Sequence, residues 1–256
     1  MLTIDLNCDL GEGGAADAEL MAGCTSVNLA AGGHAGGGAL LAEAVARARA
    51  AGVAIGAHPG YEDRANFGRV DLGLSPEGIT ATVRWQIEAV RALTLLRHVK
   101  PHGALYNRAA RDPAAARAIA EAVATVDASL LLFGLAGGCQ EAAARDCGLG
   151  FIAEGFADRG YEPDGQLAPR GRPGALLETP EAAVAQALRL VRAGVPGRAA
   201  GAPAARVASL CVHGDGAAAA ALLRAVGAAL RAAGVRLAAP LRNGERDRAG
   251  DAGSPP

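Results

Sequence analysis

The chain has 256 residues, of which 51% are hydrophobic and 20% are charged. That composition excludes a disordered chain and suffices for one large domain or two small ones. A formal net charge of -1 provides no basic field to attract nucleic acid or an anionic membrane, and 3% aromatic residues are too few for base-stacking platforms. We therefore expect a globular protein that acts on a small molecule, with no nucleic-acid or membrane partner.

Short β-type runs alternate with longer segments of helical periodicity, a pattern typical of βα units and a parallel sheet. In chain order, we expect strands at residues 2–7, 25–29, 53–57, 98–100, 129–134, 150–154 and 206–212. The expected helices lie at residues 16–22, 38–51, 76–96, 113–125, 139–147, 180–193 and 216–233. Seven such units favour a single closed (β/α)7 TIM-like barrel. An open doubly wound sheet is the alternative, but the glycines after the first strand lack the G-x-G-x-x-G spacing.

We assign residues 1–235 to this barrel domain and residues 236–256 to a polar C-terminal tail. The first residues carry no apolar leader, and no apolar run is long enough to predict a membrane span. The five cysteines are odd in number and never form a C-x-x-C pair, which favours reduced thiols over disulfides. We therefore expect a cytoplasmic protein.

Polar side chains gather where the expected strands end, and the carboxyl ends of parallel strands meet on one face of a barrel. Asp5, Asn7 and Asp9 alternate along the first strand, so their side chains point to the same side. Glu12 follows the same strand. The other candidates lie at the ends of later strands or in the turns after them: Asn28, His34, His58, Tyr61, Lys100, His102, Glu154, Asp158, Arg159, His213 and Asp215. Taken singly, each histidine is more often a satisfied core or surface residue. Four histidines at one end of different strands, together with the only lysine of the chain, favour a catalytic site.

The Asp-Asn-Asp run has two interpretations that the residues alone leave open. It can solvate a loop and cap a helix, or it can form a carboxylate cluster for proton transfer, cation binding or amide recognition. The chain contains no G-x-x-x-x-G-K-[ST] P-loop, no G-x-S-x-G and no H-E-x-x-H motif. The remaining chemistries are proton transfer among Asp and His residues and hydrolysis assisted by a metal that these groups hold.

Several long motifs resemble successive blocks of the LamB/YcsF family in the same order and spacing. They comprise residues 4–12 (IDLNCDLGE), 25–28 with 32–36, 52–61 with 67–69, 99–107 (VKPHGALYN), 156–161, 164–165, 169–170 and 211–216. The match extends to about residue 235. The sequence departs from the family pattern at Ala31, Gly33 and Gly37, where the family usually has Cys, Phe and Asp.

The resemblance implies a seven-stranded (β/α) barrel related to glycoside hydrolase and polysaccharide deacetylase barrels. It also implies one subunit of an ATP-dependent 5-oxoprolinase, a cyclic amide hydrolase that converts 5-oxo-L-proline to L-glutamate together with two partner subunits, B and C. ATP is then a co-substrate of the complex, which agrees with the missing P-loop in this chain. Whether a divalent metal binds stays open.

On this basis the expected catalytic residues are Asp5, Asn7, Asp9, His34, His58, His102, His213 and Asp215. The expected substrate-binding residues are Glu12, Asn28, Tyr61, Arg69, Lys100, Tyr106, Asn107, Glu154, Asp158, Arg159 and Arg170. We expect the Asp-Asn-Asp run, with His58 or His34, to deprotonate the attacking water. Lys100, His102 and Arg159 are expected to offset negative charge, and Asp215 to orient His213. If a metal binds, its candidate ligands are Asp9, His58 and His102.

Two other classes of function stay open. The chain can be a stand-alone metal-dependent hydrolase or deacetylase that acts on an amide or an acetylated sugar. It can also be a subunit that only binds and carries the substrate. Metal content, ATP-free turnover and the catalytic effect of histidine substitutions discriminate among these classes.

Overall fold

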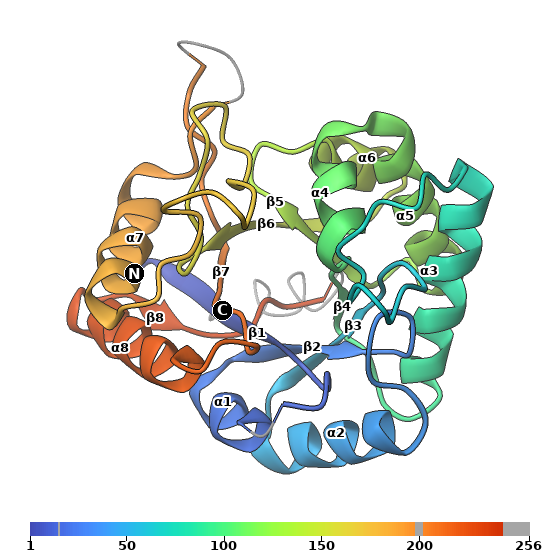
Figure 1. Ribbon diagram of the computed structural model, residues 1–256, viewed down its shortest axis with the longest axis horizontal. Coiled ribbons are helices and arrows are strands. Elements are labelled where there is room, and N and C mark those ends of the chain that lie inside the picture. The colour runs from blue at the N-terminus through green and yellow to red at the C-terminus, as the bar shows by residue number, and fades with distance from the viewer. Residues whose placement is uncertain (15, 198–201, 243–256) are drawn as a thin grey trace, which may run out of the picture.

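The computed structural model describes residues 1–14, 16–197 and 202–242, and it shows a ring of strands surrounded by helices (Figure 1). The strands are β1 (Thr3–Leu10), β2 (Ser26–Ala30), β3 (Ala54–His58), β4 (His98–Val99), β5 (Leu131–Leu135), β6 (Gly150–Phe156), β7 (Ser209–Cys211) and β8 (Arg236–Leu237). The helices are α1 (Asp17–Gly23), α2 (Gly38–Ala51), α3 (Pro76–Arg91), α4 (Gly103–Arg111), α5 (Pro113–Val126), α6 (Gln140–Asp146), α7 (Pro180–Ala193) and α8 (Ala219–Ala232).

Strand β1 closes the ring. The sheet runs in the order β2-β3-β4-β5-β6-β7-β1, and β1 also pairs with β2, so that β1 to β7 form a continuous cylinder. Every pairing is parallel. The prediction of a (β/α)7 TIM-like barrel is therefore confirmed.

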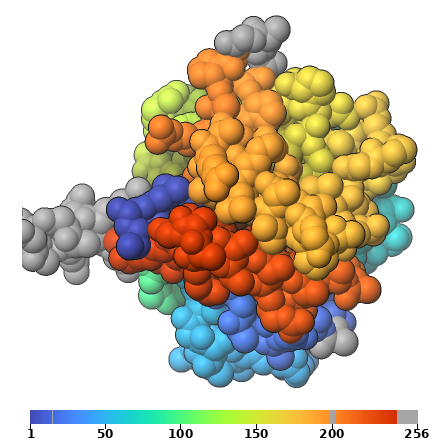
Figure 2. All heavy atoms as spheres, turned by 90° about the vertical axis from the view of Figure 1, so that its left-hand side faces the viewer, coloured from blue at the N-terminus to red at the C-terminus, as the bar shows by residue number. Residues whose placement is uncertain are grey.

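The eighth strand lies outside this cylinder. Arg236 and Leu237 pair in parallel with Thr3 and Ile4 at the start of β1. Figure 2 shows the blue N-terminal residues beside the red C-terminal part of the described chain. These two residues, which were expected in the tail, thus belong to the sheet. Residues 243–256 of the predicted tail lie outside the described residues.

Three of the outer helices begin with the same local chemistry. The side chains of Ser75, Asp112 and Thr179 accept hydrogen bonds from the backbone N–H groups of the first turn of α3, α5 and α7. In each helix, proline occupies a first-turn position. A capping oxygen satisfies a free N–H group, and proline has none to lose. These short motifs fix where the helices start.

Two helices differ from the sequence-based expectation. Helix α3 ends at Arg91 instead of residue 96, because the apolar residues after it belong to a turn that leads into β4 and leaves Leu95 75% exposed. Helix α4 was not predicted, although it buries an apolar face that includes Leu105 and Tyr106. It begins at Gly103, directly after the turn Pro101-His102 that follows β4. Among the described residues, no helix is long and apolar enough to cross a membrane.

Candidate active site

The interior of the barrel is polar along β1. Asp5, Asn7 and Asp9 are buried, and each forms a hydrogen bond with a side chain of a neighbouring strand. The residues between them on β1, such as Leu6 and Cys8, join the apolar core. The period of two along a strand therefore separates a polar interior from an apolar exterior, as the alternation in the sequence predicted.

Asp5 lies among hydroxyl groups at the start of this polar column. Thr25, Ser26 and Ser209 all donate hydrogen bonds to its carboxylate, at 2.6 to 2.9 Å. Burial raises the pKa of Asp5 to about 6, although these three hydrogen bonds work in the opposite direction. The predicted catalytic role of Asp5 has no support in this geometry, because the residue does not line the cavity described below.

The raised pKa of Asp5 predicts a pH-dependent stability difference. Between the unfolded value of 3.8 and the folded value of about 6, the folded chain binds more protons at this residue, so stability falls as the pH rises. We expect wild type to lose roughly 2 kcal/mol relative to Asp5→Asn between pH 4 and pH 7. Urea unfolding of both proteins at several pH values measures this difference. A pH-independent difference would contradict the assignment.

Lys100 is the cation at the centre of the site. Its Nζ lies 2.9 Å from both Asp9 Oδ1 and Glu154 Oε1, and it also contacts Asn7 Oδ1 at 3.2 Å and Cys211 Sγ at 3.1 Å. Burial alone would lower the pKa of Lys100, but the negative charges of Asp9 and Glu154 raise it well above its usual range. Lys100 is therefore a protonated, structurally fixed cation.

Glu154 and Asn28 complete the hydrogen bonding around this cation. Glu154 accepts hydrogen bonds from Asn7 Nδ2 at 2.8 Å and from the Tyr106 hydroxyl at 2.9 Å. Asn28 donates to Asn7 Oδ1 and to Asp9 Oδ1, both at 2.8 Å, and its own Oδ1 lies 2.7 Å from Nε2 of the buried His98. Glu154 and Asn28 thus hold the centre in place and are buried beneath the cavity instead of lining it.

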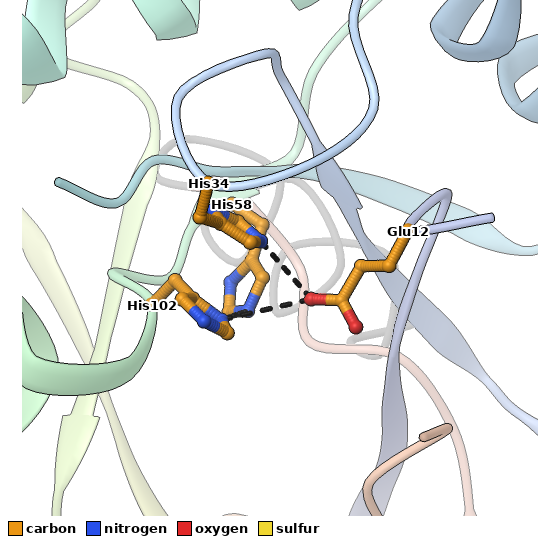
Figure 3. A group of neighbouring side chains, drawn as sticks. All are labelled: Glu12, His34, His58 and His102. Carbon is orange, nitrogen blue, oxygen red and sulfur yellow. Dashed lines mark hydrogen bonds and ion pairs between the residues drawn. The ribbon is translucent and has the colours of Figure 1, made fainter. Parts of the chain in front are cut away.

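Three histidines from different loops and strands meet beside Asp9. Figure 3 shows His34, His58 and His102 close together, with Glu12 directed at them. The rings of His34 and His102 stack at 3.6 Å, and His58 meets both nearly at right angles. His58 Nε2 lies 3.4 Å from Asp9 Oδ2, and His34 Nε2 lies 3.0 Å from Glu12 Oε1. The predicted convergence of these residues is present in the structure.

Backbone carbonyl groups fix the orientation of two of the rings. His58 Nδ1 lies 2.7 Å from the carbonyl oxygen of Lys100, and His102 Nε2 lies 2.9 Å from that of Phe67. Phe67 has a φ of 55°, which is uncommon for a residue other than glycine. Burial lowers the pKa of His102 well below its usual range. The neutral ring is therefore the favoured form of His102.

Gly60 and Gly68 allow the backbone to pass directly against the stacked rings. A Cβ atom at residue 60 would lie 2.8 Å from His34 Nδ1. At residue 68 it would lie 2.8 Å from His34 Cβ and 3.0 Å from His102 Cδ2. The two contacts at 2.8 Å are too close for a real side chain. The glycines of these turns therefore give the histidine cluster the space that it occupies.

Gly68 and Gly73 form a matched pair for testing this crowding, because their φ values are +63° and +62° and only Gly68 has neighbours within 4 Å of the added Cβ. We expect Gly73→Ala to cost about 1–2 kcal/mol through its backbone conformation alone. Gly68→Ala should cost a further 1–3 kcal/mol or so by forcing the histidines apart. Urea denaturation measures both costs, and equal losses would contradict the crowding argument.

His213 belongs to a second acid–base pair, and its partner differs from the predicted one. His213 Nδ1 lies 2.8 Å from Asp158 Oδ2, and the backbone N–H of His213 donates to the same oxygen at 2.9 Å. Although burial raises the pKa of Asp158, the charge and hydrogen bonds of His213 outweigh it and hold that pKa below its usual value. The prediction that Asp215 orients His213 is wrong, because Asp215 turns away to pair with Arg69 and Arg170.

A cavity of about 440 Å³ opens above these groups, within the range of small-ligand sites. Its lining includes the cationic side chains of Arg69, Lys100, Arg111, Arg159 and Arg170, against the carboxylates of Asp9 and Asp71. This excess of cations suits an anionic ligand. Arg159 is mainly engaged with the wall, since it donates to the carbonyl groups of Ala168 and Ala175.

The cavity separates the predicted site residues into two groups. Those that line it are Asp9, His58, Arg69, Lys100, His102, Tyr106, Asn107, Arg159, Arg170 and His213. Those that do not line it are Asp5, Asn7, Glu12, Asn28, His34, Tyr61, Glu154, Asp158 and Asp215. Tyr61 was predicted to bind the substrate, but its side chain is buried and its hydroxyl donates a hydrogen bond to Asp71 at 2.8 Å.

Some site residues were not predicted as such. Phe156 stacks on His213 and lines the cavity, Cys211 contacts Lys100, and Arg111 contributes a further cation. Cys211 has a detectable signal, since it lies two residues before His213 at the end of a predicted strand. Arg111 has none, because it lies at the far end of the unpredicted helix α4.

The chain forms a closed parallel barrel, and charged residues line a cavity at the carboxyl ends of its strands. This is the architecture of a barrel enzyme. The model of the LamB/YcsF family matches residues 4–245, and the chain belongs to this family. The family resemblance found in the sequence is thereby confirmed.

Individual relatives agree with this assignment. The chain is 47% identical to the 5-oxoprolinase A subunit of Symbiobacterium thermophilum over 248 residues, which cover 93% of this chain and 95% of the relative. The crystal structure of the lactam utilization protein from Thermus thermophilus superimposes with a TM-score of 0.83 at 43% identity, covering 93% of this chain and 100% of that protein.

Proposed function

We propose that this chain is the A subunit of an ATP-dependent 5-oxoprolinase, which hydrolyses 5-oxo-L-proline to L-glutamate together with two partner subunits, B and C. The observation that carries the proposal is the cation-rich cavity above Asp9, Lys100 and His213, in a chain closely similar to a relative with that name. The substrate is a small lactam with a carboxylate, and the exposed cations of the lining suit such an anion.

ATP is a co-substrate in this proposal because a lactam is a poor electrophile. Phosphorylation of the amide oxygen turns that oxygen into a leaving group, so that water can attack the ring carbon. The carbon–nitrogen bond then breaks and the nitrogen takes up a proton, which leaves γ-glutamyl phosphate. A second water cleaves this acyl phosphate to L-glutamate and inorganic phosphate. Because this chain has no P-loop, we assign activation by ATP to the partner subunits.

The residues of this chain divide the remaining work. His213, oriented by Asp158, takes the proton from the attacking water through Nε2, the nitrogen that does not face Asp158. Lys100 keeps Asp9 ionised and fixed beside His58. Arg69 and Arg170 lie on the cavity wall, where they can bind the substrate carboxylate. All five cysteines are free, which is compatible with the proposed cytoplasmic location.

Reconstitution of the complex tests the proposal. We expect glutamate to form from 5-oxo-L-proline only when this chain, both partner subunits and ATP are all present. Omission of any one component should abolish product formation. ATP-independent turnover of an amide or an acetylated sugar by this chain alone would instead support the stand-alone hydrolase or deacetylase.

A further inference from the structure

We propose that Glu12, His58 and His102 bind a divalent first-row transition-metal ion such as Zn²⁺, with His34 as a positioning residue. This ligand set replaces Asp9 of the sequence-based candidates by Glu12. The inference rests on the geometry of these side chains alone and does not depend on the proposed 5-oxoprolinase activity.

The strongest observation is that ring nitrogens of two histidines face each other at short distance. The carbonyl oxygens of Lys100 and Phe67 can only accept, so His58 Nδ1 and His102 Nε2 carry the hydrogens. Where neither of the opposite nitrogens, His58 Nε2 and His102 Nδ1, carries a hydrogen, their lone pairs point at each other across only 3.0 Å. A cation between them removes this conflict. Metal-binding histidines usually donate their other ring N–H to a carbonyl or carboxylate in this way.

Glu12 supplies the third ligand. Its Oε1 lies 3.6 Å from His102 Nδ1, and the candidate ligand atoms of this cluster all lie within 4.8 Å of one another. Bonds of about 2.0–2.1 Å in tetrahedral geometry separate ligand atoms by roughly 3.3 Å. The separations of 3.0 and 3.6 Å bracket that value, so the three side chains can close on an ion with only small movements.

His34 cannot be a further ligand in the same geometry. An imidazole binds a metal in the plane of its ring, but the rings of His34 and His102 are stacked 3.6 Å apart with an interplanar angle of 4°. An ion in the plane of His102 therefore lies well outside the plane of His34. His34 Nε2 instead lies 3.0 Å from Glu12 Oε1, where its N–H can hold the carboxylate toward the other two histidines (Figure 3).

Asp9 is engaged elsewhere, because its Oδ1 accepts hydrogen bonds from Lys100 and Asn28. Its Oδ2 lies 3.4 Å from His58 Nε2, so that its charge favours a cation beside that ring without replacing Glu12. His58 and His102 both line the cavity. Three protein ligands next to a cavity leave a coordination position for water or substrate, as in catalytic zinc sites.

Nitrogen-15 NMR of the histidine side chains tests the proposal on the wild-type protein. The chain has only five histidines, so each ring can be resolved. After chelator treatment, one equivalent of Zn²⁺ should shift the resonances of His58 Nε2 and His102 Nδ1 and leave those of His98 and His213 unchanged. A shared proton in place of the metal site would leave all five rings insensitive to Zn²⁺ and would overturn the proposal.

Calorimetric titration of Zn²⁺ into variants provides the second measurement. We expect one ion per chain, at least 100-fold weaker binding in His102→Ala and Glu12→Gln, and about 10- to 100-fold weaker binding in His34→Ala. His213→Ala is the matched control and should bind Zn²⁺ within about twofold of wild type. Equal affinities for all variants, or tight binding lost only with His213, would contradict the assignment. Because each result concerns metal binding without turnover, it is independent of the reconstitution experiment.

Discussion

The Lys100→Met variant is expected to lose turnover entirely and to lose about 3–5 kcal/mol of its free energy of unfolding. Lys100 is 2% exposed and holds its ammonium 2.9 Å from the carboxylates of Asp9 and Glu154. Without it, two buried carboxylates have no cation between them. Methionine fills the volume of the side chain, so the effect measures the charge. Urea unfolding followed by circular dichroism gives the stability, and glutamate release by the reconstituted complex gives the activity.

The pH dependence of this loss has a definite sign. Burial raises the pKa of Asp9, but His58 and Lys100 outweigh it and hold that pKa well below 3.8. Asp9 therefore contributes stability that is present above its unfolded pKa and is lost as the pH falls. The cost of Lys100→Met should consequently be smaller at pH 4 than at pH 7. A pH-independent cost would show that lost packing, not lost charge, causes the effect.

Two controls isolate the buried charge. Arg117→Met removes the cation of an exposed helical ion pair with Glu121 and should change stability by less than about 1 kcal/mol. Adding Glu154→Gln to Lys100→Met removes one of the two stranded charges and should recover part of the stability without recovering turnover. If the single variant cost no more than Arg117→Met, Lys100 would not be the electrostatic centre of the barrel.

The barrel was predictable because two local sequence patterns indicate it. Strands β1 to β7 follow from the alternation of short β-type runs with helical segments, and the inward direction of Asp5, Asn7 and Asp9 follows from the period of two. Helix α4 was hidden because it begins directly after His102 and ends at the cap of α5, so that its single apolar face is short. The pairing of β8 depends on contact with β1, more than two hundred residues earlier, which no local pattern encodes.

The site was only partly predictable. The end of a strand determines where a site residue lies, but the turn that follows determines the direction of its side chain. Lys100, His58 and His102 converge because each follows a strand, and a parallel barrel brings those ends together. Their hydrogen-bond partners depend on the path of the loops. Phe67, whose carbonyl fixes His102, lies 35 residues before it and adopts an uncommon backbone conformation. No pattern in the sequence near His102 predicts that contact.

The partner of His213 shows the same limit. Asp215 is the nearest acid in the sequence, yet the turn after β7 directs it to Arg69, which lies 146 residues away. Asp158, 55 residues away, follows β6, the strand next to β7, and therefore lies at the correct height beside His213. Neighbouring strands in a barrel thus supply better partners than neighbouring residues in the chain.

Asp158→Asn is accordingly expected to lower kcat by about 10²–10⁴-fold, whereas Asp215→Asn should leave kcat nearly unchanged. In Asp158→Asn, the amide oxygen can still accept the backbone N–H of His213, which directs the amide NH₂ toward His213 Nδ1. Nδ1 must then accept, so the ring proton moves to Nε2, and that nitrogen can no longer take a proton from water. The fold keeps its hydrogen bonds while the base is lost.

Steady-state kinetics of the reconstituted complex separate the two aspartates, and the combination with His213→Ala tests whether Asp158 acts through the imidazole. Asp215 is the shared counterion of Arg69 and Arg170, so Asp215→Asn should change KM through these two arginines and spare kcat. The double variant Asp158→Asn/His213→Ala should be no slower than His213→Ala alone, because a partner that only orients the ring has nothing left to orient. Multiplicative losses, or a larger fall in kcat for Asp215→Asn than for Asp158→Asn, would restore Asp215 as the orienting residue and remove the Asp158–His213 pair from the mechanism.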